Sequence, residues 1–438
     1  MILINKLKIH PYYIFAKEKW LNDGFQKYFQ NMSWMFAGRV LTILITFLVN
    51  IYIARYLQPL DYGILNYVLS FVGLFAILPS LGVDSILLRE LSYNKEKRNS
   101  LLGTAFTIKG IGAILAFLLV IVIVFVGKIG SYERLLILIY STTFFFSAFN
   151  VIEIFFQSSV LSKKTVFVQI TSTIIVTAFK IYLLINNYGT GWFILAYVLD
   201  SLLLAIGSIY VYKKYKEQIL KWCFHLPTAK ILLNNSWPII LAGFAGMIYL
   251  KIDQVMIRNI LDNYQLGIYS AAVKLSEFWY FIPGVIAGSV FPAIINAKKT
   301  SEGQYLSRLK KLNWLLILIA LVIAIPVSLF SKQIINLIFG AKYILSAPSL
   351  SVYIWAGVAV FWGAGIAQYL IAENKTVKFF ITTSTGALVN IILNFYMIPL
   401  LGIVGAAWAS LISYFVVPLM LLSWKDTRGQ IINLFKFK

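Results

Sequence analysis

Ten charged side chains lie well inside long apolar stretches of this chain. The cations are Lys251, Lys274, Lys109, Arg39 and Lys180, and the acids are Asp253, Glu277, Glu153, Asp84 and Asp200. A charge at the centre of a membrane helix costs about 2.5–3.5 kcal/mol, so several of them in one chain indicate a polar cavity inside a helical bundle. Because lysine and arginine bind phosphate oxygens, a cationic cavity favours an anionic cargo such as a phosphate or diphosphate.

Spacing along two neighbouring helices places the strongest candidates together. Lys251 and Lys274 each lie six or seven residues from the turn that joins their helices, so both should sit about 10 Å below the same surface. Glu277 follows Lys274 at i+3 on the same helix face and can pair with it. Asp253 can reach Lys274 across the turn. We therefore expect both lysines to line the cavity.

The remaining charges are weaker candidates. Lys109 lies about eight residues from its helix end, and we expect it to line the cavity as well. For Arg39 and Lys180, extension of the head group to the membrane interface is an equal alternative. The acids Asp253, Glu277, Glu153, Asp84 and Asp200 are candidates for ion coupling or for charge pairs within the membrane.

Histidine and cysteine are missing from the apolar stretches. The two histidines, His10 and His225, fall in basic segments outside them, and the single cysteine, Cys223, rules out an intrachain disulfide. The sequence has no GxxxxGK[ST] loop for nucleotide phosphates. We therefore expect no catalytic residue, no metal site and no cofactor, and the chain is not predicted to be an enzyme.

Twelve apolar stretches are long enough to serve as membrane helices, each of which needs about 20 residues. They cover residues 34–54, 62–82, 101–126, 135–156, 166–185, 192–211, 237–257, 267–295, 313–330, 350–372, 377–398 and 403–424. The 438 residues are 60% hydrophobic and only 12% charged, whereas a soluble domain is about 25% charged. The sequence therefore predicts an all-α polytopic membrane protein with about 12 transmembrane helices.

The basic residues predict the orientation. With both termini in the cytoplasm, 27 of the 38 Lys and Arg residues fall in cytoplasmic segments and 6 in outer loops. This asymmetry is what the positive-inside rule requires. The formal net charge of +22 therefore reflects topology, and nucleic acid is not an expected partner.

A basic connector, residues 212–236, divides the spans six and six. We expect a cytoplasmic lead (1–33), a first half (34–211), the connector, a second half (237–424) and a cytoplasmic tail (425–438). A weak repeat links the halves, because Arg55 precedes Gly63-Ile64 as Arg258 precedes Gly267-Ile268. Internal duplication would produce this pattern, although chance similarity of two apolar turns is the alternative.

Within the second half, one short motif predicts close helix packing. Gly284 and Gly288 form a GxxxG pair, which is typical of helices whose backbones approach each other in a membrane.

Several segments, in order along the chain, resemble a known family. They are residues 38–91, 152–164 (IEIFFQSSVLSKK), 247–257 (MIYLKIDQVMI), 266–283 (LGIYSAAVKLSEFWYFIP) and 394–413 (NFYMIPLLGIVGAAWASLIS). Together they resemble the polysaccharide transport family of O-antigen (Wzx-type) flippases, within the exporter superfamily that includes MATE transporters and lipid II flippases. The lead before the first span is longer than this family suggests.

The resemblance implies two six-helix lobes around a central cavity. It implies transfer of undecaprenyl-diphosphate-linked oligosaccharide from the cytoplasmic to the outer leaflet of the bacterial inner membrane, by alternating access. In such proteins, cavity cations handle the diphosphate, a role that falls first on Lys251 and Lys274, then on Arg39, Lys109 and Lys180. Expected partners are membrane lipids, the lipid-linked oligosaccharide, a polysaccharide polymerase and chain-length machinery.

Two other functions compete with this one. A MATE-like drug/ion antiporter needs an acidic, aromatic cavity, whereas the cavity here looks basic. A polymerase or ligase needs a sizeable outer loop with catalytic side chains, and the longest predicted outer loop, residues 331–349, is short and mostly apolar. The sequence alone identifies neither the glycan nor the coupling ion.

Overall fold

The chain is built from helices. The computed structural model describes residues 23–215, 217–373 and 375–435, and every regular element within them is helical. This confirms the predicted all-α class. Residues 1–22 of the predicted lead (1–33) lie outside the described residues. Residues 23–33 form the start of the first described helix.

The helices of the first half run from α2 to α10. They are α2 (Asp23–Gly73), α3 (Ile77–Ser80), α4 (Val83–Tyr93), α5 (Arg98–Val126), α6 (Ser131–Ser141), α7 (Thr143–Ser147), α8 (Val151–Ser158), α9 (Lys163–Ile185) and α10 (Thr190–Lys214). Those of the second half are α11 (Leu226–Ile260), α12 (Asn263–Glu277), α13 (Phe281–Thr300), α14 (Glu302–Leu329), α15 (Ser331–Ile338), α16 (Ala347–Tyr353), α17 (Ala356–Ala372), α18 (Thr376–Met420) and α19 (Lys425–Phe435).

The described residues hold nine helical segments that are long and apolar enough to cross a membrane, or ten if a bent pair near α16 and α17 is one span. Two of the nine, Ser33–Tyr93 and Val377–Met420, are far longer than the roughly 20 residues of one crossing. Each contains a residue with non-helical backbone, Gln58 in α2 and Gly402 in α18. Both residues lie between predicted spans. The count of twelve stays a prediction.

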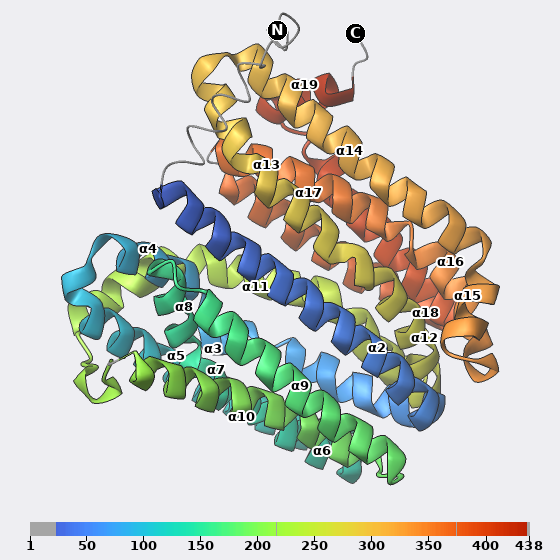
Figure 1. The fold of residues 1–438 in the computed structure, drawn as a ribbon. Helices are drawn as coiled ribbons and strands as arrows, with labels where there is room; N and C mark the ends of the chain where they lie inside the picture. Colours follow the sequence, from blue (N-terminus) through green and yellow to red (C-terminus); the bar gives the residue numbers. More distant parts are fainter. Residues whose placement is uncertain (1–22, 216, 374, 436–438) are drawn as a thin grey trace, which may run out of the picture.

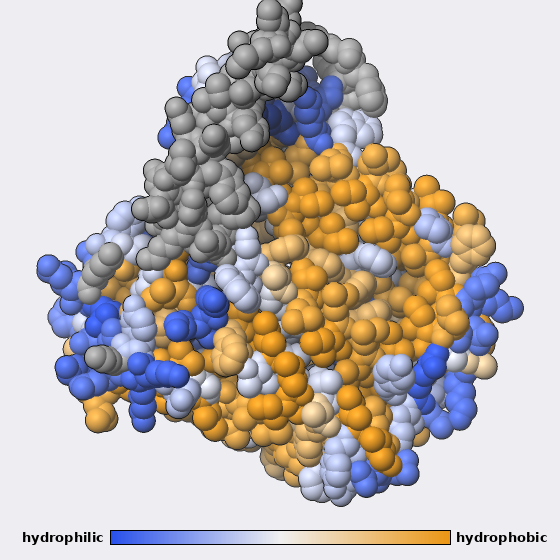
Figure 2. Space-filling view, in the orientation of Figure 1, coloured by the Kyte–Doolittle hydropathy of each residue, from blue (hydrophilic) through white to orange (hydrophobic). Residues whose placement is uncertain are grey.

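The surface matches a membrane environment. Figure 2 shows apolar side chains across the middle of the molecule and hydrophilic ones gathered toward its edges. Large apolar side chains such as Val122, Phe125 and Leu329 are exposed. In water such a surface would be unfavourable, whereas lipid chains solvate it without cost.

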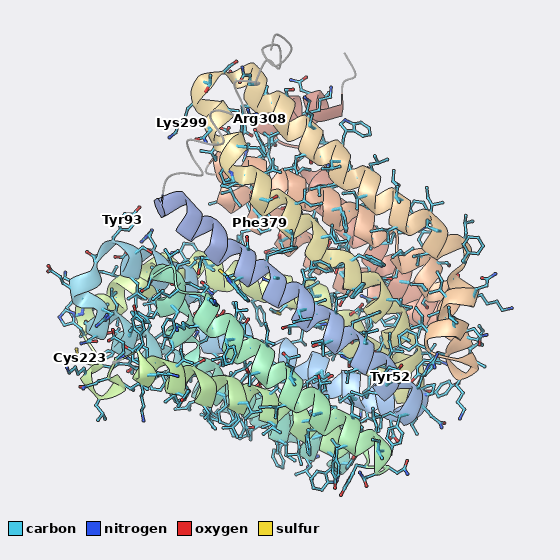
Figure 3. The ribbon with its side chains drawn as sticks, viewed as in Figure 1. Tyr52, Tyr93, Cys223, Lys299, Arg308 and Phe379 are labelled. Carbon is cyan, nitrogen blue, oxygen red and sulfur yellow. The ribbon has the colours of Figure 1, made fainter. Side chains whose placement is uncertain are left out.

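The basic connecting segments gather at one edge of the molecule. In Figure 3, Tyr93 and Cys223 lie at the left and Lys299 and Arg308 at the upper left, whereas Tyr52 lies at the lower right, near the bend of α2. This placement is consistent with one shared side for the basic loops. That this side is cytoplasmic stays a prediction, and the opposite end is called the far end below.

Figure 1 shows the helices of the first half below and most of those of the second half above, converging toward the far end of α2. Their shared core lies there. Tyr62 and Leu65 of α2 belong to the same buried apolar cluster as Ile268 and Tyr269 of α12. The pair α2 and α12 thus makes the largest single contact between the halves, and α11 also packs against α2, α3, α4 and α5.

Two glycines permit this junction. A Cβ atom added to Gly63 would lie 1.7 Å from the carbonyl oxygen of Asn263, and one added to Gly267 would lie 1.8 Å from that of Pro59. Any side chain at either position would collide with backbone. These are the glycines of the weak internal repeat, and their reciprocal contact, called the glycine seam here, brings α2 and α12 together.

The arginines of the same repeat also reach across to the opposite half. Arg55 donates to the carbonyl oxygens of Leu337 and Ile338, the former through a short contact and the latter at 2.7 Å. Arg258 forms an ion pair with Glu133 on α6. The far end is therefore closed by paired contacts around the glycine seam.

The predicted GxxxG pair does not behave as expected. A Cβ atom added to Gly284 or Gly288 would meet no described atom within 4 Å. The prediction of close helix packing at these two glycines is therefore wrong, because spacing within one helix cannot specify which helix lies opposite.

Candidate substrate site

The structure brings three of the predicted cations into one region. Lys180 comes from α9, Lys251 from α11 and Lys274 from α12. The charges of Lys180 and Lys251 repel that of Lys274, and Glu277 attracts it. We call these three residues the lysine cluster. It combines side chains from both halves, which the separate spans of the sequence could not reveal.

Each lysine of the cluster has a different environment. The Nζ atom of Lys251 lies 3.9 Å from a carboxylate oxygen of Glu277. The buried Lys180 places its Nζ atom 3.6 Å from the centre of the Tyr197 ring, a cation–π contact. Lys274 is partly buried and forms no ion pair or hydrogen bond with any described residue. Of the three lysines, only Lys251 therefore forms an ion pair among the described residues, while the charge of Asp200 also acts on Lys180 and that of Asp253 on Lys251.

Glu277 pairs with a different lysine from the one that helical spacing suggested. It lies near Lys251 and also accepts a hydrogen bond of 3.3 Å from Tyr353, rather than pairing with Lys274. Glu277 is the last residue of α12, where the chain tightens into a 3-10 turn at Phe278–Tyr280. Both Lys274 and Glu277 lie within α12, so the i,i+3 spacing is kept, and the carboxylate is instead directed by its contacts with Lys251 and Tyr353 from other helices.

Tyrosines surround this part of the second half. The rings of Tyr249, Tyr280 and Tyr353 each lie within 6.4 Å of the Tyr414 ring, and that of Tyr249 lies 4.2 Å away. The buried hydroxyls of Tyr249, Tyr280 and Tyr414 have no hydrogen-bond partner among the described residues. Leaving a buried polar group unpaired costs about 1–3 kcal/mol, so we expect water or a ligand to form hydrogen bonds with these hydroxyls.

Asp253 lies in a buried polar network rather than in an ion pair. It accepts a hydrogen bond of 2.6 Å from Tyr269 and a longer one of 3.5 Å from Ser410. No cation of the described chain lies within 4.0 Å of it, so the contact with Lys274 that the turn permits is not formed.

The network continues into α18. Asn390 donates to Ser413 at 3.0 Å, Asn394 donates to Asn390 at 3.0 Å, and all three are fully buried. The amide oxygen of Asn394 has no partner among the described residues. The sequence interpretation missed these residues, although polar side chains within an apolar span were a signal for them.

Lys109 and Asp84 pair with each other. The Nζ atom of Lys109 lies 2.7 Å from a carboxylate oxygen of Asp84; the lysine side chain is 2% exposed and that of the aspartate 41%. The pair joins α4 to α5, away from the lysine cluster. Lys109 is thus a predicted cavity lysine whose charge is matched by a carboxylate at 2.7 Å.

The other predicted charges line two adjoining cavities in the first half. One has a volume of about 420 Å³ and its lining includes Arg39, Glu153 and Asp200. The second, of about 280 Å³, shares Glu153 and Gln169 with the first. The first lies among α2, α8, α9 and α10, and the second among α7, α8, α9 and α10. The structure therefore places Arg39, Glu153 and Asp200 together at the first cavity without placing them in the lysine cluster.

Residues 28–298, more than half of the chain, match a protein family described as "Polysaccharide biosynthesis protein". This chain belongs to that family. One relative that matches over nearly its full length is the capsular polysaccharide biosynthesis protein CapF of Staphylococcus aureus. It is 21% identical over 88% of this chain and 96% of its own length.

Solved structures share the fold. An inward-facing multidrug resistance MATE family transporter of the MOP superfamily has a TM-score of 0.71 at 13% identity, over 90% of this chain and 95% of its own. The lipid II flippase MurJ, in an inward closed conformation, has a TM-score of 0.64 at 17% identity, over 93% and 90%. The family match confirms the predicted family, and the solved structures show that the fold is shared. The roles of individual residues stay proposals.

Proposed function

We propose that this protein is a flippase. Its cargo would be an oligosaccharide linked through a diphosphate to undecaprenol, the repeat unit of an O-antigen or another surface polysaccharide. The observation that carries the proposal is the lysine cluster, which brings together three ammonium groups from both halves and leaves Lys180 and Lys274 without an ion pair among the described residues. A diphosphate carries several negative charges and would supply the missing counter-charge.

Membership in the polysaccharide biosynthesis family and a fold shared with a lipid II flippase support this reading. The protein would act as a transporter rather than an enzyme. It would lie in the bacterial inner membrane with both termini in the cytoplasm, and would deliver its cargo to a polymerase and chain-length machinery at the outer face.

Transfer between leaflets requires access from each side in turn. We propose that the halves, 34–211 and 237–424, act as two lobes that separate at the glycine seam when the outer side opens. The reciprocal contacts of Arg55 and Arg258 would break at the same step. Since these contacts lie at the far end, opposite the basic loops, the described conformation would be closed to the outside.

The buried Asp253 network supports a role in coupling transport to an ion. A carboxylate that forms no ion pair with any described residue, together with the unpaired amide oxygen of Asn394, offers oxygen ligands to a small cation or a site for a proton. Asp253 lies two residues from Lys251 on α11, so occupancy of this network can influence the lysine cluster. We expect Asp253→Asn to leave cargo binding intact and to remove the dependence of transport on the ion gradient.

A MATE-like drug/ion antiporter is the second candidate. The fold shared with a MATE transporter supports it, and so do Glu153 and Asp200 in the first-half cavities, because carboxylates attract cationic drugs. Against it stands the lysine cluster, which would repel such drugs.

The deciding experiment removes two lysines of the cluster. Purified protein is reconstituted in vesicles, and transfer of an undecaprenyl-diphosphate-linked oligosaccharide to the opposite leaflet is measured. Each charge-assisted hydrogen bond is worth about 1.5–3 kcal/mol, so Lys251→Ala with Lys274→Ala should reduce transfer by at least about 100-fold. Lys332→Ala with Lys342→Ala, at exposed positions, is the matched control and should transfer at the wild-type rate.

Unchanged transfer by the cluster variant would contradict the proposed role of these lysines. Transport of a cationic drug by the wild-type protein, with no transfer of the lipid-linked sugar, would support the antiporter instead.

A further inference from the structure

The two first-half cavities have a lining that suits sugar hydroxyls. Their joint boundary contains amide, hydroxyl, carboxylate and guanidinium groups, together with the aromatic rings of Phe146 and Phe149. The polar residues that line them include Asn150, Glu153, Gln157, Gln169, Asp200 and Arg39. The larger cavity, about 420 Å³, falls in the usual range for ligand pockets of about 300–1,000 Å³.

We propose that these cavities form a sugar subsite that accepts a neutral or amino sugar next to the diphosphate and disfavours an acidic one. This inference rests on the proposed function, because it assigns the part of the same cargo that lies beyond the diphosphate.

Free hydrogen-bonding atoms remain at this subsite. Both Gln157 and Gln169 donate to Oε1 of Glu153 at 3.1 Å, and Oε2 accepts no hydrogen bond from any described residue. Ser172 donates to Oδ1 of Asp200 at 2.6 Å, and Oδ2 is likewise left without a described donor. The glutamines hold the Glu153 carboxylate in place, and its second oxygen is left for a ligand.

Donors are available beside these acceptors. Arg39 lines the larger cavity and makes no ion pair or hydrogen bond with the described part of the chain. A sugar ring presents hydroxyls that both donate and accept, and its apolar face can pack on Phe146 or Phe149. A site with free carboxylate oxygens, a free guanidinium and two rings meets each of these requirements.

The subsite adjoins the lysine cluster. Asp200 lines the larger cavity, and its charge also acts on Lys180, one member of the cluster. A diphosphate held by the lysines would thus have its first sugar directed toward Asp200 and Glu153. The protein would recognise two parts of the cargo. Cations from both halves would bind the diphosphate, and the first half would bind the sugar.

Charge determines the selectivity. The subsite has two carboxylates, Glu153 and Asp200, and one guanidinium, Arg39. Of these three charged residues, only Glu153 borders both cavities. The carboxylate of a uronic acid in the smaller cavity would therefore face a like charge, with no cation in the lining of that cavity. Like charges at close range in a low-dielectric site repel strongly, whereas a hydroxyl or an ammonium group would be attracted.

The test compares three ligands on the full-length protein in nanodiscs. They are bare polyprenyl diphosphate, the same lipid carrying a neutral hexose, and the same lipid carrying a hexuronic acid. Wild-type protein should bind the hexose form about tenfold more tightly than the bare diphosphate, since one hydrogen bond to a charged group is worth about that much. It should bind the hexuronate form at least about tenfold more weakly than the hexose form.

Replacing the carboxylate gives an outcome that misfolding cannot imitate. Glu153→Gln should bind the hexuronate form about tenfold more tightly than wild type, and leave binding of the bare diphosphate unchanged. Asp200→Asn should change the preference in the same direction. Glu96→Gln, at an exposed position in a basic loop, is the matched control and should behave as wild type.

Two results would overturn the subsite. One is equal wild-type affinity for the hexose and hexuronate forms. The other is a Glu153→Gln variant whose binding of the bare diphosphate changes as much as its binding of the sugar forms. Failure of wild-type protein to bind the bare diphosphate would instead overturn the proposed function, and the subsite with it.

Discussion

A methyl group at the glycine seam should open the far end of the molecule. The Cβ atom of a Gly63→Ala variant would begin 1.7 Å from the Asn263 carbonyl oxygen, and Cβ atoms essentially never come closer than 3.0 Å to such an atom. The backbones of α2 and α12 must therefore move apart by at least 1.3 Å, the difference between these distances.

The energetic cost can be bounded. Inserting a methyl group into a well-packed contact costs about 1–3 kcal/mol, which is about 5–150-fold in the equilibrium between closed and open far ends. Alanine also favours helix over glycine by about 1 kcal/mol, so any loss of the closed form must come from the contact and not from helix propensity.

Distances between spin labels measure this equilibrium. Cys223 is the single cysteine, so a Cys223→Ser background allows labels at Asp61→Cys in the first half and Lys342→Cys in the second, both exposed. Gly63→Ala should increase the population with longer label separations and slow lipid-linked sugar transfer. Gly288→Ala is the matched control, because a Cβ atom there meets no described atom within 4 Å.

A Gly63→Ala protein with the wild-type distance distribution and wild-type transfer would refute this reasoning. It would mean that the contact between α2 and α12 tolerates a methyl group, or that the halves do not part there.

Two further predictions concern charges outside the lysine cluster. Asp84→Asn should destabilise the protein by about 3–5 kcal/mol, because it leaves Lys109 buried and uncompensated; Lys109→Ala should cost less, since Asp84 is partly exposed. The free energy of unfolding in detergent measures both effects. The double variant Lys109→Met with Asp84→Leu, which replaces the ion pair with apolar side chains, should recover most of the lost stability. If this variant is as unstable as Asp84→Asn, the unpaired charge is not the cause of the destabilisation. Burial tends to raise the pKa of Glu373, but hydrogen bonds from Lys298 and Tyr305 outweigh it and hold that pKa below the ordinary 4.5. The stabilisation is therefore complete above 4.5 and lost as the pH falls through the lower folded value, so the difference in unfolding temperature between wild type and Glu373→Gln should vanish in acid. A difference that persists there would contradict this assignment.

Much of the candidate site could be located from the sequence, because a charge within an apolar span is conspicuous. Lys180, Lys251 and Lys274 were found in this way, and so were Glu153 and Asp200. Their partners were not, because helical spacing describes neighbours on one helix and most contacts here join two. Lys109 illustrates the limit, since its depth in α5 is visible in the sequence and its pairing with Asp84 on α4 is not.

The amino-acid sequence by itself determined the all-helical membrane class, the family, and the clustering of basic residues in alternate loops. These properties follow from local hydropathy and charge, which need no knowledge of which helices meet. Only the tertiary structure decided that Gly63 and Gly267 face each other, that Glu277 lies by Lys251, and that Glu153 and Asp200 share a cavity. Those outcomes depend on packing between segments up to about two hundred residues apart, where each helix could have met several others and the total of all contacts selects one arrangement.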